Sequence, residues 1–345
     1  MRIGLPDTLR FARYGPYWEK FITALDSTPV RPVRPLEEAL SIGVKALPRE
    51  PLTVQLFVGR LMELLATTDH LVLPDLNPNS EPSTFGAAGD PWQVDLPSIL
   101  AERFTLPSFS RAPLHASVEE IEGAAVQLGA KAARQPQLVR RALERAELQL
   151  RVEAQPHLDL DAPGLISVAL VADPALLEAP LLAVHALQAI LNQGLYCLPI
   201  TVVPFAQAAK EAGGLLKRAR RVLLPTELEM AGGAASLVRR GSVRGVVFIT
   251  QPDADATNEA LLEIAQAVTK PTVTLHLTRN LSFSREDTGR LTAFAQGLGS
   301  RPRPPLPSGR EENRNPFANP QQGEASAPEP DDSPVIPDEA PPWES

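Results

Sequence analysis

Short apolar runs alternate with helix-like segments through most of this 345-residue chain. The clearest run, residues 165–171 (Leu-Ile-Ser-Val-Ala-Leu-Val), is almost wholly apolar and rich in branched side chains. Such a run is typical of a strand buried on both faces, as in a parallel sheet covered by helices. Because strand and helix patterns alternate, we expect parallel sheets with right-handed crossovers. The sequence therefore predicts the α/β fold class.

The first thirty residues predict the opening unit of such a domain. Residues 2–5 are typical of a short buried strand, which ends at Pro6. Pro16 stands where a helix can begin, because the first helical position has no N–H to lose. Three apolar side chains then recur at a spacing of four, on one face of that helix: Tyr17, Phe21 and Leu25.

The rest of the chain continues this alternation. We expect further helices at 36–44, 52–65, 92–104, 117–153 (split at Pro136), 174–193, 206–220, 227–239, 254–268 and 284–298. We expect further strands at 70–74, 198–204, 221–225, 245–250 and 271–277. Ser117 and Glu120 predict a capping box, Gly194 suits a helix end, and Gly232-Gly233 is expected to interrupt its helix.

The length favours two folded domains, and the composition changes near the end. A segment with Asp and Pro breaks, residues 157–164, predicts a boundary between domains at 1–156 and 157–300. Residues 301–345 are rich in proline and acidic towards their end, which predicts a disordered tail. Isolated apolar residues in this tail are candidate partner-docking positions: Phe317, Ile336 and Trp343. The alternative is a tail that only solubilises the protein.

Charge and cysteine content exclude several classes of protein. The net charge of −8 argues against direct binding of nucleic acid or of an anionic membrane. The single cysteine, Cys197, excludes a disulfide framework and a cysteine-only metal or iron–sulfur site within the chain. We expect Cys197 to be a small buried apolar residue. No signal peptide or membrane-length apolar run is apparent, which predicts a cytoplasmic protein.

The usual catalytic motifs are missing from the sequence. The five histidines are scattered, and His157 with Asp159 and Asp161 is better interpreted as solvated linker surface than as a metal site. The glycine pairs at 86–89 and 232–233 do not match a dinucleotide fingerprint, and neither a phosphate-binding loop nor a serine nucleophile elbow is present. The residues themselves therefore predict no catalytic group, no metal and no cofactor.

Several blocks, in order, resemble the 2-hydroxyacyl-CoA dehydratase family. More narrowly, the chain resembles the subunit related to the D-component of 2-hydroxyglutaryl-CoA dehydratase and the activase-associated proteins similar to it. The blocks are Arg2-Ile-Gly-Leu-Pro6, Tyr14-Gly-Pro-Tyr17-Trp18, Leu56-Phe-Val-Gly59, Asp90-Pro-Trp-Gln-Val-Asp-Leu-Pro97, Gly245-Val-Val-Phe-Ile249 and Thr288-Gly-Arg-Leu-Thr-Ala-Phe294. The resemblance spans residues 1 to about 298. It implies two stacked Rossmann-like (flavodoxin-like) domains with mainly parallel sheets and a cleft between them.

The resemblance also implies an iron–sulfur cluster in that cleft, held by cysteines. Pro51, Asp90 and Asp253 occupy the corresponding positions. Proline cannot bind iron, and isolated aspartates do not replace soft thiolates. The resemblance therefore implies a degenerate member without a cluster. Three aromatic residues are candidates for lining the cleft, with core positions as the alternative: Tyr14, Trp18 and Trp92.

Three hypotheses follow. The first is a non-catalytic, iron–sulfur-free homologue that binds a protein partner, such as a related dehydratase-like subunit, or an acyl-CoA-like ligand. The second is an accessory dehydratase subunit whose cluster is supplied by a partner chain. The third is a regulatory or DNA-maintenance adaptor that docks through its acidic tail.

Overall fold

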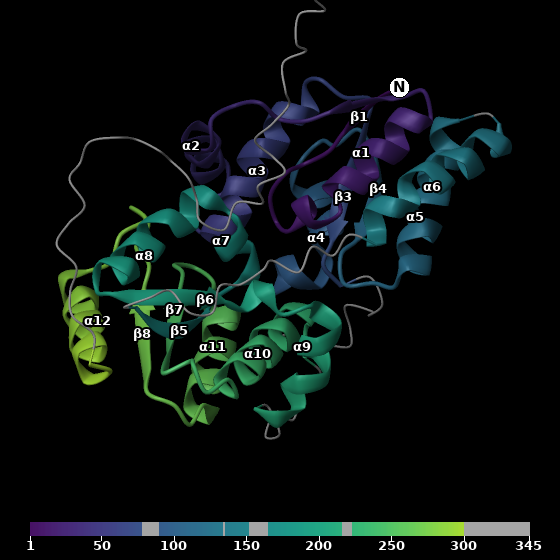
Figure 1. Cartoon of the computed structure of the whole chain (residues 1–345). Helices are drawn as coiled ribbons and strands as arrows, with labels where there is room; N and C mark the ends of the chain where they lie inside the picture. The colour runs from purple at the N-terminus through teal and green to yellow at the C-terminus, as the bar shows by residue number, and fades with distance from the viewer. Residues whose placement is uncertain (78–89, 134, 152–164, 216–222, 300–345) are drawn as a thin grey trace, which may run out of the picture. The chain divides into compact units, whose positions relative to one another are not determined.

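The computed structural model describes residues 1–77, 90–133, 135–151, 165–215 and 223–299. Both of its sheets belong to one compact unit, Met1–Pro307. The predicted boundary at 157–164, the predicted tail from 301 and the candidate docking residues Phe317, Ile336 and Trp343 lie outside the described residues. We call residues 1–151 the N-terminal half and residues 165–299 the C-terminal half (Figure 1).

Each half contains one four-stranded sheet, and every strand pair is parallel. The first sheet has the order β2-β1-β3-β4, with strands Thr28–Val30, Arg2–Gly4, His70–Asp75 and Ser108–Pro113. The second has the order β6-β5-β7-β8, with strands Leu195–Pro199, Ile166–Val171, Gly245–Thr250 and Thr272–His276. Within each half this is the strand order 2-1-3-4 of flavodoxin-like folds, so the predicted α/β class and parallel sheets are confirmed.

Helices cover both faces of the first sheet. One face carries α1 (Gly15–Ala24), α5 (Val118–Ala132) and α6 (Pro136–Arg151), and the other carries α3 (Leu52–Leu65) and α4 (Pro91–Arg103), with α2 (Leu36–Ala46) packed on α3. Successive side chains of a strand point to opposite faces. In β3, Val72 therefore joins the core under α1, whereas Leu71 and Leu73 join the core under α3.

The second sheet is covered in the same way. In chain order its helices are α7 (Pro174–Glu178), α8 (Pro180–Asn192), α9 (Phe205–Glu211), α10 (Pro225–Val238), α11 (Asp255–Ala267) and α12 (Arg285–Gly297). Helices α9, α10 and α11 lie together on one side of this sheet, and α8 lies on the other (Figure 1). The two halves thus repeat one order of strands and helices.

Glycine permits the same close helix contact in both halves. Gly59 is the eighth residue of α3, and a Cβ added there would lie 1.8 Å from the carbonyl oxygen of Ala39 in α2. Gly232 is the eighth residue of α10, and its Cβ would lie 1.7 Å from the carbonyl oxygen of Ala208 in α9. The prediction that Gly232-Gly233 interrupts its helix is wrong, because these residues bring α10 close to its neighbours without a break.

Several expected elements differ from the observed ones. Strands β2 and β4 were not predicted; β2 is a three-residue strand at the edge of the sheet, where a proline such as Pro29 is tolerated. The expected helix 174–193 is two helices, because Pro180 starts a new one. The expected strand 198–204 is instead the end of β6 followed by a 3-10 turn, Ile200–Val202. Residues 223–225 lead into α10 and form no strand.

Candidate functional site where the two sheets meet

The carboxyl ends of both sheets lead into a shared polar interface. In open parallel sheets, ligands bind beyond the carboxyl ends of the strands, at the point where the strand order reverses. Here the segments that follow β1 and β4 carry Arg10 and His115, and those that follow β5 and β7 carry Asp173 and Gln251. All four side chains are buried. Hydrogen bonds and ion pairs from these segments join the halves, and we call this region the inter-half interface.

Arg10 is the positively charged residue at the centre of the inter-half interface. Its guanidinium lies 2.6 Å from Glu229 Oε2, on α10, and 3.2 Å from Glu178 Oε1, at the end of α7. Leu9 and Arg10 both have positive φ angles, 49° and 63°, a region that side chains other than glycine rarely adopt. The backbone is therefore locally strained where it places this arginine between two glutamates of the other half.

His115 adds a second cross-half contact to Glu229. Its Nε2 lies 3.4 Å from Glu229 Oε2 and its Nδ1 lies 3.0 Å from the carbonyl oxygen of Leu76. The ring also packs against Phe205, with the ring centroids 4.6 Å apart. The histidine is thus held by polar and aromatic neighbours from both halves.

Amide and hydroxyl groups make the remaining polar links. Gln251 Nε2 donates to Asp173 Oδ2 at 3.0 Å and to Thr53 Oγ1 at 3.4 Å, so the side chain of Gln251 bridges the halves. Gln93 and Thr257 are each the third residue of a helix, α4 and α11, and Gln93 Nε2 donates to Thr257 Oγ1 at 3.0 Å. The first turns of two equivalent helices therefore meet at this point.

Burial shifts the pKa values of the carboxyl groups in the interface. It raises the pKa of Asp173 to about 6, and it also raises the pKa values of Asp90 and Glu178. Burial alone would raise the pKa of Glu229 as well, but the positive charge of Arg10 and the contact with His115 lower it to about 2. Glu229 is therefore firmly ionised, whereas Asp173 and Asp90 are buried acids without a base at ion-pair distance among the described residues.

The space left in this interface is small. A cavity of about 20 Å³ lies among residues from both halves, including Arg10, Pro51, Asp90, Trp92, Asp173 and Thr226. A cavity of roughly 10–15 Å³ is the least that holds one water molecule. Among the residues that the structure describes, this cavity therefore has room for about one water molecule, which is too little for a cofactor or a substrate.

Two of the three positions that the resemblance assigns to cluster ligands line this cavity. Pro51 and Asp90 line it as the N-cap residues of α3 and α4. Asp253 is not among the lining residues; it has a positive φ of 58° and pairs with Arg279. Asp90 accepts hydrogen bonds from the Trp92 backbone N–H and from Thr257. Its oxygens thus cap a helix and bond across the interface.

The candidate cleft aromatics have different surroundings. Trp92 lines the cavity; its Nε1 donates to Glu50 Oε2 at 2.6 Å, and the Arg103 guanidinium lies 5.0 Å from its ring centroid. Trp18 is fully buried in the core under α1, and Tyr14 is half-buried against that core. The structure therefore brings Trp92, but not Tyr14 or Trp18, to the inter-half cavity.

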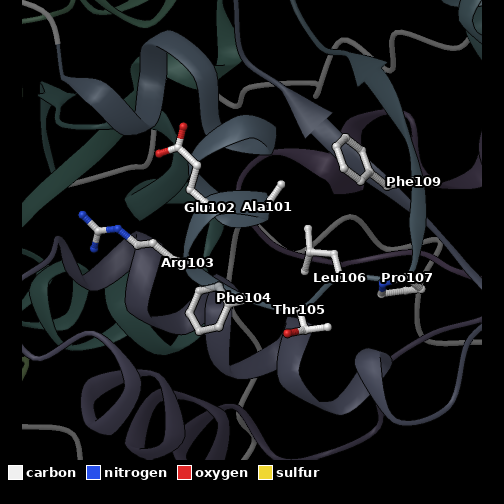
Figure 2. A pocket seen from close by; sticks show the side chains of 8 residues that line it. All are labelled: Ala101, Glu102, Arg103, Phe104, Thr105, Leu106, Pro107 and Phe109. Atoms are coloured by element: carbon white, nitrogen blue, oxygen red, sulfur yellow. The ribbon is translucent and has the colours of Figure 1, made fainter.

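A larger hollow of about 410 Å³ lies elsewhere, between the end of α4 and the start of β4. Figure 2 shows the side chains that line it, which include Phe104, Leu106 and Phe109. Phe109 is the second residue of β4, so this hollow opens near the amino end of that strand. Because ligands of open α/β sheets bind at the carboxyl ends, we assign the candidate site to the inter-half interface instead.

A histidine flanked by two serines, His70, is structural. Ser108 Oγ donates to the carbonyl oxygen of Asp69 at 3.4 Å, so it accepts from His70 Nδ1 at 2.7 Å, and His70 Nε2 then accepts from Ser110 Oγ at 3.0 Å. Burial and the charge of Lys131 lower the pKa of His70 to about 4, so the ring is neutral. Because Ser108 accepts from the ring, His70 does not act as a base towards that hydroxyl.

Sequence reasoning missed the central side chains of the interface. Gln251 directly follows one predicted strand, and Asp173 lies two residues after another. These positions alone could have marked both residues as candidates for the site. Arg10, His115 and Glu229 carry no such signal, because their pairing joins residues more than a hundred positions apart.

The described residues contain no group of three or more His, Cys, Asp or Glu side chains arranged to hold a metal ion. Among the helices of the described residues, none has the length and apolar character needed to cross a membrane. No protein-family model matches the chain, and no curated protein matches it.

Proposed function

We propose that the protein is a non-catalytic binding or scaffold protein, related to the 2-hydroxyacyl-CoA dehydratase subunits but without their iron–sulfur cluster. The observation that carries the proposal is the inter-half interface. Beyond the carboxyl ends of the strands, described side chains bond to one another across the halves, and the cavity among them measures about 20 Å³. Such an interface supports a rigid body that presents its outer surface to a partner protein.

The residues at the expected cluster positions support the same proposal. Pro51 has no side-chain ligand atom, and the carboxylate of Asp90 is occupied by a helix cap and by Thr257. Cys197, the one thiol, is buried in β6. Soft thiolate ligands are what an iron–sulfur cluster needs, and no set of them is available in this chain.

The test is isothermal titration of the full chain with CoA and acetyl-CoA, followed by cross-linking of the tagged full chain and of residues 1–307 in native cells. We expect no saturable CoA binding. We also expect the full chain and residues 1–307 to form cross-links to the same defined partner. A saturable CoA complex would favour an acyl-CoA-binding role. Co-purifying iron with a cysteine-rich partner would favour the accessory-subunit alternative. A partner lost with the tail would favour the adaptor alternative.

A further inference from the structure

The hollow of about 410 Å³ at the end of α4 has an apolar wall that is anchored in the core. Phe104, Leu106 and Phe109 line the hollow, are each half-buried, and pack against the core under α3. Figure 2 shows Phe104 between the charged side chains of Glu102 and Arg103 and the apolar side chains of Leu106 and Phe109. The volume lies within the range of about 300–1,000 Å³ that is usual for ligand pockets. The faces of two aromatic rings attract a cation as well as an apolar stem.

The end of α4 adds backbone hydrogen-bond acceptors to this opening. The last carbonyl groups of a helix have no N–H donor within the helix. Here the Phe104 N–H reaches the carbonyl oxygen of Leu100, and among the described residues no backbone N–H donates to the carbonyl oxygens of residues 101–103. The carboxyl end of a helix also carries a partial negative charge. These groups therefore favour a ligand that donates hydrogen bonds and is positively charged.

The side-chain charges at the opening favour the same kind of ligand. Arg103 Nη1 lies 2.7 Å from Glu50 Oε1, so the positive charge of Arg103 is already balanced. Glu102 is exposed and has no base at ion-pair distance in the part of the chain that the structure describes. Lys131, which is not a lining residue, donates to the Phe109 carbonyl oxygen at 3.1 Å. Glu102 is thus the lining charge that is left for a ligand.

We propose that this hollow binds an arginine or lysine side chain of a partner protein. Its charged head would lie at Glu102 and the carbonyl end of α4, and its stem would lie against Phe104 and Phe109. Arginine and lysine combine a long apolar stem with a head that donates hydrogen bonds and accepts none. The inference rests on the proposed function, since it names the kind of partner surface that the scaffold recognises.

The test is ¹H–¹⁵N NMR of the full chain, titrated with a hexapeptide of alternating arginine and leucine. We expect the amide signals of residues 101–106 to shift in a saturable manner. The same peptide with neutral citrulline in place of arginine should bind several-fold more weakly, and so should n-butylamine. No saturable shift, or equal affinity for the citrulline peptide, would overturn the proposal. Equal affinity for n-butylamine would overturn its assignment to a partner protein in favour of a free amine.

Variants of the hollow test the two parts of the site separately. Glu102→Gln should weaken binding of the arginine peptide by about threefold, as expected for an exposed charge pair. Phe109→Leu keeps an apolar side chain but removes the aromatic face, and should weaken binding by a similar factor. The matched control is Glu263→Gln, the same charge change at an exposed position of α11, which should leave the affinity unchanged.

Equal affinities for the wild-type chain and Glu102→Gln would overturn the proposal, even if Phe109→Leu fails to fold. The readout is confined to residues 101–106, at the end of α4. A failure here is therefore distinct from a failure of the proposed function, which a saturable CoA complex would show.

Discussion

The Arg10 guanidinium and the Glu229 carboxylate lie 2.6 Å apart, one from each half, with side chains only 5 % and 1 % exposed. Removing one partner of such a buried pair leaves the other charge uncompensated, which costs about 3–5 kcal/mol. We therefore expect Arg10→Met to lower the free energy of unfolding by that amount. Urea unfolding monitored by tryptophan fluorescence measures it. A loss near zero would show that the pair does not stabilise the closed halves, and Arg140→Met, at an exposed pair on α6, is the matched control.

Asp173 makes stability depend on pH. Burial raises its pKa to about 6 in the folded chain, above its ordinary value of 3.8, so the folded state binds the proton more tightly than the unfolded state. Its contribution is complete below about pH 4 and is lost as the pH rises through about 6. The shift corresponds to about 3 kcal/mol. Asp173→Asn, which can still cap α7 at the Ala175 N–H, should abolish this part of the pH dependence in urea midpoints.

If Asp173→Asn shows the same loss of stability between about pH 4 and about pH 8 as the wild-type chain, the burial of this carboxyl is not its cause.

Gly232 holds α10 against α9. A methyl group at this position would overlap the Ala208 carbonyl oxygen, which belongs to the backbone and cannot rotate away. We expect Gly232→Ala to cost about 3 kcal/mol or more, as overpacking of a rigid contact does. Gly123→Ala in α5 is the control, because no atom lies within 4 Å of its added Cβ and alanine favours a helix by about 0.5–1 kcal/mol. Equal thermal midpoints for the two variants would contradict the close contact.

Cys197 should be unreactive in the folded protein. Burial in β6 raises the pKa of its thiol to about 12, and the thiolate is the reactive form. We expect negligible labelling by iodoacetamide in the native chain and complete labelling after unfolding in urea, followed by mass spectrometry. Rapid native labelling would show that β6 opens, or that this thiol is exposed.

The sequence was informative where burial is uniform. The apolar run of β7 (Gly245–Thr250) and the helix α3 (Leu52–Leu65) have the predicted bounds, because strands buried on both faces and amphipathic helices leave strong local patterns. The short strand β2 was missed because it has only three residues, one of them Pro29, which are too few to show a period of two. In α10, Gly232 was misinterpreted because a glycine that breaks a helix and one that admits a neighbour look alike in sequence.

The candidate site was harder to predict for a physical reason. Its interactions join residues such as Gln93 and Thr257, which are distant in sequence and are brought together only by the packing of two folded halves. Pro51 and Asp90 were singled out through the resemblance, and they do lie beside one cavity. The buried base Arg10 and its two glutamates follow from the tertiary structure alone.

The most direct test of the proposed scaffold is hydrogen–deuterium exchange of the full chain with and without acetyl-CoA. The first turns of α3 and α10, where Thr53 and Thr226 line the cavity, report on the inter-half interface. If the halves are closed on each other, both turns are strongly protected without ligand and do not change when acetyl-CoA is added. Rapid exchange that acetyl-CoA suppresses would contradict the account, because it would show an open cleft that binds an acyl-CoA.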